Sequence, residues 1–300
     1  MPLPQSSASE IASYAIRPAN PPAYFLAIEH SQAVHRINLI NSWEPAIGPG
    51  TRVLELGCGQ GTCTQALAHA VSSPSPSSAG HITAIDPGSP DYGAPFTLAQ
   101  AQSHLKSGPI GPLITFDRAD PVAFLSAIPQ GAEPQWDVAV LAHCIWYFPS
   151  AKTLDEILSA LRGRVSRVCL AEWALHATEP AASAHVLASL ARATFEAHRT
   201  GSKENIQTLM SPRAIKDAAV RAGWKVESEG VVVPDAELSD GYWEVGTVVG
   251  EEFLEDVEKE VVDERVKAVL RSARDATIAA AEAAKHARSM DVWVATLVSE

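Results

Sequence analysis

Three glycines at alternate positions, Gly57, Gly59 and Gly61, are the feature of this sequence that most clearly suggests a binding site. They follow a short apolar run over 53–56, in which Glu55 is the charged residue, and they precede a helical stretch. Glycine adopts backbone conformations that other residues avoid, and it lets a ligand approach the main chain closely. A strand, a glycine loop and a helix in this order predict a small-ligand site at the end of the strand.

Four further segments place polar residues at or just past the end of an apolar run: Asp86-Pro87, Asp120, Ala142-His143 and Glu172-Trp173. His143 is a candidate general base, because the unperturbed pKa of imidazole lies close to neutrality. The alternative is that its ring only hydrogen-bonds to a ligand or to the backbone. Glu172 could contact a substrate or anchor a neighbouring segment, and the structural role is the simpler one.

The apolar runs alternate with helical stretches, and this alternation predicts the elements that position these residues. Strands are expected at 53–56, 82–85, 113–116, 137–141, 168–171, 225–233 and 292–298. Helices are expected at 24–43, 62–71, 98–105, 122–128, 154–161, 181–198 and 214–222. Continuous apolar strands separated by helices predict an α/β fold with a mostly parallel, seven-stranded sheet covered on both faces. Such sheets bind ligands at the carboxyl ends of their strands, where all the polar residues named above fall.

The segment from Glu55 to Gly61 resembles motif I of the class I S-adenosylmethionine-dependent methyltransferases, and the resemblance extends over residues 50–173. It implies a Rossmann-like fold with S-adenosyl-L-methionine as cofactor. It also implies that Gly57 and Gly59 pass under the methionine part of the cofactor. Glu55 would help to organise the loop and the cofactor's amino group. A nicotinamide dinucleotide site is the more distant alternative, because the third glycine of its G-x-G-x-x-G pattern would fall on Thr62.

The same resemblance assigns roles at the other strand ends. Asp86 matches the acid that binds both ribose hydroxyls, and a carboxylate suits a diol because its two oxygens can accept two hydrogen bonds. Asp120 matches the acid near the adenine amino group, and Ala142 and His143 match motif IV, beside the transferable methyl group. The full set of expected cofactor-binding residues is Glu55, Gly57, Cys58, Gly59, Gly61, Asp86, Pro87, Asp120, Ala142 and His143.

Five residues are candidates for contact with the acceptor of the methyl group: Tyr24, Trp146, Tyr147, Glu172 and Trp173. The aromatic ones among them could equally pack at the sheet edge or on the surface. Segments 142–148 and 171–175 also resemble an uncharacterised group of fungal methyltransferases that are distantly similar to the ubiquinone-biosynthesis type. No metal ion is expected, because segment 142–148 has no carboxylate and the four cysteines have no zinc-site spacing.

The negative charge of the chain is concentrated in one segment. The chain of 300 residues has a formal net charge of -12, from 35 acidic and 23 basic residues. Residues 235–264 hold 12 of the acids and one base, Lys259, so the other 270 residues are close to neutral. This segment lies in a predicted helical insertion, 234–289, in which 253–276 is expected to form one amphipathic helix. The remaining parts would be a cap at 1–45, with a loose start over 1–22, and a methyltransferase core at 46–233 and 290–300.

The sequence therefore predicts methyl transfer to a small-molecule acceptor at O, N or C. The alternative is a methyltransferase-like protein that binds the cofactor but acts as a scaffold or as a cyclase. Neither nucleic acid nor membrane is an expected partner, because there is no extended basic patch and no apolar stretch of spanning length. A homodimer could form through the insertion. Four cysteines without a pairing pattern, together with the lack of a secretory signal, favour the cytoplasm.

Overall fold

Seven strands pair into one sheet in the computed structural model, which describes residues 2–129, 134–199 and 204–300. The strands are β1 (Arg52–Leu56), β2 (His81–Ile85), β3 (Ile114–Asp117), β4 (Trp136–Ala142), β5 (Val165–Trp173), β6 (Trp224–Val232) and β7 (Val292–Ser299). Their order in the sheet is β3-β2-β1-β4-β5-β7-β6. The strands from β1 to β5 pair in parallel, whereas β7 runs antiparallel to both β5 and β6. The expected α/β fold with a mostly parallel sheet is confirmed.

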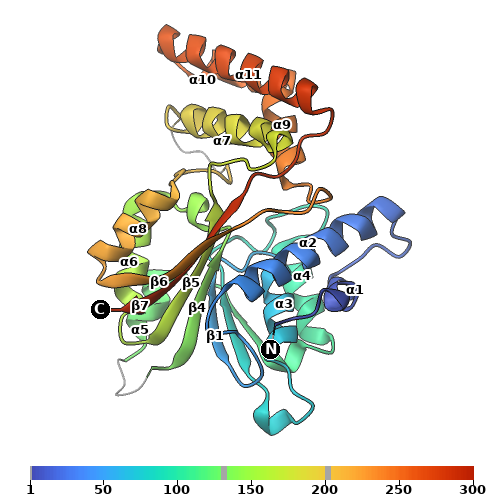
Figure 1. Ribbon diagram of the computed structural model, residues 1–300, viewed down its shortest axis with the longest axis vertical. Coiled ribbons are helices and arrows are strands. Elements are labelled where there is room, and N and C mark those ends of the chain that lie inside the picture. The colour runs from blue at the N-terminus through green and yellow to red at the C-terminus, as the bar shows by residue number, and fades with distance from the viewer. Residues whose placement is uncertain (1, 130–133, 200–203) are drawn as a thin grey trace.

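Helices cover both faces of this sheet (Figure 1). One face carries α1 (Ala8–Ser13), α2 (Ala23–Ser42), α3 (Thr62–Val71) and α4 (Leu98–Ser107). The other carries α5 (Pro121–Ala127), α6 (Ala151–Leu161) and α8 (Pro212–Arg221). The central strands are apolar and buried between the two helical layers, which is why they form a parallel sheet. β1 pairs with β2 on one side and with β4 on the other, so the strand order switches sides at β1. In open α/β sheets a ligand-binding crevice forms at the carboxyl end of the strands at such a point.

A separate group of helices stands beyond the carboxyl ends of the strands, at the top of Figure 1. It consists of α7 (Ser183–Glu196), α9 (Asp240–Val249), α10 (Glu251–Glu260) and α11 (Glu264–Ala284). These helices enclose a hydrophobic cluster of their own, in which the rings of Phe195 and Phe253 meet edge to face at 5.7 Å. Helix α7, which precedes the expected boundary at residue 234, thus packs with the insertion. It also contacts the main core through Val186 and through His185, whose ring meets that of Trp173 edge to face at 5.0 Å.

Two other expectations about local structure were wrong. The stretch 253–276 is two helices, because the first ends at Glu260 and Asp263 caps a new one by accepting a hydrogen bond from the Arg265 amide at 2.8 Å. The N-terminus is not loose, since α1 buries Ala8, Ile11 and Ala12 against the core. Among the described residues, no helix is both long and apolar enough to cross a membrane.

Candidate active site

The glycine loop has the backbone geometry that its sequence predicts. Gly57, Gly59 and Gly61 have φ angles of 74°, 53° and 92°, a region that disfavours residues with a Cβ. Gly57 is also held close to the segment after β4, because a Cβ at this position would lie 2.5 Å from the Cβ of Cys144. The Gly57 and Cys58 amides donate to the Ile85 carbonyl of β2 at 2.8 and 3.2 Å, and this closes the loop against the neighbouring strand end.

Asp86, at the end of β2, is fixed beside this loop. Its Oδ2 accepts a hydrogen bond from the Gly59 amide and its Oδ1 from the Gly88 amide, both at 2.8 Å. Each carboxylate oxygen can accept a second hydrogen bond, so a diol could still bind here. Pro87 is exposed. Asp120 caps α5 by accepting from the Ala123 amide at 2.8 Å, and it is exposed as well.

Glu55 is almost fully buried beneath the loop. Its Oε2 accepts a hydrogen bond from the Thr64 hydroxyl at 2.6 Å, which ties the end of β1 to the first turn of α3. Burial raises the pKa of Glu55 to about 7, and the Thr64 hydrogen bond and the charge of Arg36 partly oppose this rise. The residue therefore organises the loop from below.

His143 lies at the centre of a buried polar cluster after β4, next to the half-buried Ala142. Its φ of 55° is left-handed, which is uncommon for a residue other than glycine. Its Nε2 is 2.9 Å from the Nε2 of His35 on α2, its Nδ1 is 3.6 Å from the Oε1 of Glu172, and its ring lies 4.3 Å from that of Trp173. The arrangement fits a proton on Nδ1 that faces Glu172 and a hydrogen bond from His35 to Nε2.

Burial sets the protonation of this cluster. It lowers the pKa values of His143 and His35 well below their ordinary range, and the charge of Arg36 acts in the same direction. Both imidazoles are thus neutral near pH 7. Burial raises the pKa of Glu172 to about 7, although its carboxylate accepts hydrogen bonds from the amides of Ile145, Trp146 and Trp173. Glu172 therefore anchors the segment after β4.

The predicted aromatic residues divide between the core and the surface. Trp146 is buried and donates from Nε1 to the Met210 carbonyl at 2.8 Å, whereas Trp173 stacks among the histidines of the cluster. Neither lines the cleft described next. Tyr147 and Tyr24 do line it, and they are 49% and 68% exposed. The sheet edge thus packs Trp146 and Trp173 and presents the two tyrosines.

A cleft of about 640 Å³ opens between α2, the loop before α4, the start of α3 and the start of α9. Gln60 and Thr62, on either side of Gly61, form part of its wall. Arg36 also lines it. The guanidinium of Arg36 is more than nine-tenths buried, and its Nε and Nη1 have no hydrogen-bond partner. An unpaired buried cation is costly, so this group is ready to accept an anion.

Of the residues that line this cleft, the sequence predicted only Tyr24 and Tyr147 as site residues; Arg36, Asp240 and Trp243 are among those it did not predict. Arg36 carried a usable signal, because Phe25, Gln32 and Arg36 recur at helical spacing on one face of α2. A charged residue on an otherwise covered helix face indicates a partner. Asp240 and Trp243 gave no such signal, since they belong to an insertion whose position the sequence did not reveal.

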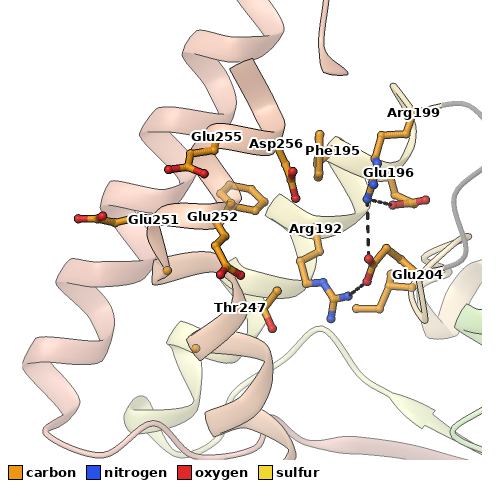
Figure 2. A pocket seen from close by; sticks show the side chains of 14 residues that line it. Arg192, Phe195, Glu196, Arg199, Glu204, Thr247, Glu251, Glu252, Glu255 and Asp256 are labelled. Carbon is orange, nitrogen blue, oxygen red and sulfur yellow. Dashed lines mark hydrogen bonds and ion pairs between the residues drawn. The ribbon is translucent and has the colours of Figure 1, made fainter. Parts of the chain in front are cut away.

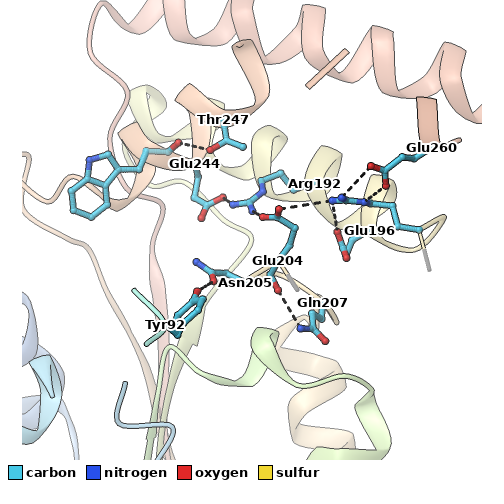
Figure 3. A network of polar contacts seen from close by, with 11 residues as sticks. Tyr92, Arg192, Glu196, Glu204, Asn205, Gln207, Glu244, Thr247 and Glu260 are labelled. Carbon is cyan, nitrogen blue, oxygen red and sulfur yellow. Dashed lines mark hydrogen bonds and ion pairs between the residues drawn. The ribbon is translucent and has the colours of Figure 1, made fainter. Parts of the chain in front are cut away.

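A second cavity, of about 680 Å³, lies within the separate helical group, between α7, α9 and α10 (Figure 2). Its two arginines are neutralised by acids: Arg192 pairs with Glu204 and Glu244, and Arg199 pairs with Glu260 (Figure 3). None of the residues predicted for cofactor or acceptor lines it. Across the described part of the chain, no three His, Cys, Asp or Glu side chains are placed to hold a metal ion.

Comparison with known proteins agrees with this geometry. No family model matches the chain. Methyltransferase phomM and Methyltransferase phomM' of Diaporthe leptostromiformis are 34% and 32% identical to it, and each match covers 82% of this chain and 72% of the relative. A solved structure, the cyclopropane-fatty-acyl-phospholipid synthase-like protein from Lactobacillus casei, is 28% identical. It covers 98% of this chain and 100% of its own, with a TM-score of 0.83. The identity to the two relatives, the fold and the glycine loop together place the chain in the class I S-adenosylmethionine-dependent methyltransferases.

Proposed function

We propose that this methyltransferase binds S-adenosyl-L-methionine between the glycine loop and α2, and that its acceptor is a small molecule bound in the adjoining cleft. The observation that carries the proposal is Arg36, whose buried guanidinium lines the cleft with two unpartnered nitrogens. The cofactor has a carboxylate at its methionine end, and a guanidinium recognises a carboxylate through paired, charge-assisted hydrogen bonds. The residues present therefore fit the cofactor.

The other strand ends offer the remaining contacts. Asp86 would accept hydrogen bonds from the ribose hydroxyls with the lone pairs that the Gly59 and Gly88 amides leave free. Asp120 is exposed at the start of α5 and would receive the adenine amino group. At Gly59 the space where a Cβ would stand is open, so a ligand can approach the backbone there.

When bound, S-adenosyl-L-methionine supplies a methyl group on a positively charged sulfur. Such a donor needs little covalent help, so the chain must hold the acceptor in line, exclude water and accept any proton that the acceptor loses. Helix α2 covers the site, and Tyr24 and Tyr147 at the cleft give the acceptor an aromatic wall. We retain His143 as the proposed base. Since its Nε2 faces His35, it would accept a proton only after this contact opens.

The size of the cleft supports a small-molecule acceptor, because about 640 Å³ is the volume of an ordinary small-ligand pocket. We also propose the cytoplasm as the compartment, because all four cysteines are buried free thiols. A homodimer through the helical insertion, and the absence of nucleic acid and membrane partners, stay predictions from the sequence.

Calorimetric titration with S-adenosyl-L-methionine tests the role of Arg36. We expect Arg36→Ala to weaken binding by about 10- to 100-fold, the range for hydrogen bonds to a charged group, and Arg36→Lys to recover part of the loss. Arg265→Ala is the matched control, because the side chain of Arg265 is 94% exposed on α11, outside the cleft. Circular dichroism confirms folding of each variant. Unchanged affinity in folded Arg36→Ala would refute the carboxylate contact, and no binding to the wild type would refute the proposed site.

A further inference from the structure

The outer wall of the cleft comes from the helical insertion. Asp240 is the first residue of α9, and its Oδ2 accepts a hydrogen bond from Gln32 Nε2 on α2 at 2.6 Å. Trp243 lies one turn further along α9 and lines the same cleft, with 47% of the residue exposed. Two parts of the chain that are 208 residues apart are therefore joined at the mouth of the cleft.

The charges that line the cleft are unevenly compensated. Glu29 pairs with Arg17 at 2.5 Å, so its charge is already balanced. Asp240 is half-buried, and this burial raises its pKa. Among the groups that lower the pKa of Asp240, the charge of Arg36 has the largest effect. Once a cofactor carboxylate takes up the charge of Arg36, the Asp240 carboxylate loses its compensating cation. A positively charged group beside it would restore the balance.

The neighbouring side chains are suited to a flat or apolar body that carries such a cation. Tyr24, Tyr147 and Trp243 all line the cleft and are all substantially exposed. Exposed aromatic side chains gathered in a concave site stack on ligands and attract cations through their ring faces. The phenol of Tyr147 has a raised pKa from desolvation of its ring end and from the nearby acids Glu244, Glu172 and, less strongly, Asp240. The acid and the aromatic wall are thus one surface.

We propose that Asp240 and Trp243 determine acceptor specificity, and that they select an amine: its cationic nitrogen binds the Asp240 carboxylate while its apolar body lies against Trp243 and the two tyrosines. This inference rests on the proposed function, because it takes the cleft as the acceptor site of the methyltransferase. It gives the insertion a role in recognition. The acidic charge of the insertion as a whole is not needed, since one carboxylate at the start of α9 makes the contact.

Two small probes that share a ring and differ in charge test this selection. Tyramine and 4-hydroxyphenylacetate are titrated calorimetrically into the full-length protein saturated with S-adenosylhomocysteine. We expect tyramine to bind at least about tenfold more tightly, the lower end for a charge-assisted hydrogen bond. We expect Asp240→Asn to remove this preference and Trp243→Ala to weaken the binding of both probes. The control Asp275→Asn, at an exposed acid of α11, should change the affinity of neither probe.

The outcomes separate this inference from the proposed function. If S-adenosylhomocysteine does not bind to the wild type, the proposed cofactor site fails. If S-adenosylhomocysteine binds, three results overturn the amine inference alone: the two probes bind equally, 4-hydroxyphenylacetate binds more tightly than tyramine, or neither probe binds. Loss of S-adenosylhomocysteine binding in folded Asp240→Asn also overturns it, because Asp240 would then serve the cofactor. Retention of the tyramine preference in Asp240→Asn does the same.

Discussion

Replacement of Gly57 by alanine tests how tightly the glycine loop is held against the segment after β4. The substitution has two separate costs. A side chain at a φ of 74° is in the left-handed region, which costs about 1–2 kcal/mol. The new Cβ would also lie 2.5 Å from the Cβ of Cys144, an overlap that requires backbone movement and costs about 1–3 kcal/mol. We expect Gly57→Ala to lower the free energy of unfolding by about 2–5 kcal/mol.

The loop provides its own control. Gly59 also has a positive φ, of 53°, but a Cβ there would meet nothing within 4 Å. Gly59→Ala should therefore show the backbone cost alone, about 1–2 kcal/mol. The cost of the overlap with Cys144 is isolated by Cys144→Gly, which removes the Cβ atom that the new Cβ of residue 57 would meet. In a double-mutant cycle, the destabilisation by Gly57→Ala should shrink by at least about 1 kcal/mol when residue 144 is glycine.

Urea unfolding followed by circular dichroism and tryptophan fluorescence gives these free energies, and agreement of the two signals checks that the transition is cooperative. Calorimetry with S-adenosyl-L-methionine on the folded variants then reports whether the loop still binds the cofactor. The reasoning would be refuted if Gly57→Ala were no more destabilising than Gly59→Ala. It would also be refuted if the cycle gave additive costs, because the close contact with Cys144 would then not resist a Cβ.

Two further predictions concern the buried polar groups. If His143 is the base, His143→Asn lowers kcat by at least about 100-fold, whereas His35→Asn leaves kcat within a few fold. Equal, modest losses in both variants, measured as S-adenosylhomocysteine release with the acceptor, would make both histidines positioning residues. The pKa of Glu55 is raised from 4.5 to about 7, so its protonation stabilises the fold at low pH and this contribution is lost as the pH rises through 7. Glu55→Gln should therefore reduce the fall in unfolding free energy between pH 5 and pH 8 by up to about 3 kcal/mol, and an unchanged slope in urea titrations over that range would contradict the raised pKa.

The strands and the glycine loop could be predicted from the sequence because their signals are local. The central strands β1, β4 and β5 are built around apolar runs, and burial on both faces requires that pattern. The loop needs residues that tolerate positive φ at positions 57, 59 and 61. Glycine meets this requirement through its own backbone freedom, independently of tertiary contacts. The expected strand ends therefore differ from the observed ones by only a few residues.

The division of roles within the site was decided by tertiary contacts. Nothing local distinguishes Trp146, which is buried against the Met210 carbonyl, from its exposed neighbour Tyr147. The break between α10 and α11 was equally hidden, because the apolar spacing runs through a capping residue, Asp263, that also suits a helix surface. In each case the outcome depends on which distant segment packs there.

The sequence by itself predicted the sheet and the glycine loop, since these follow from periodicity and from residue types within short windows, and it pointed to the family through the resemblance of segment 55–61 to motif I. Only the tertiary structure showed that Arg36 of α2 lines the cleft unpaired and that Asp240 of the insertion joins the same cleft through Gln32. The physical reason is that burial and charge compensation are properties of the folded surroundings. An arginine and an aspartate 204 positions apart show no relation in the sequence, and only the fold places them in one cleft.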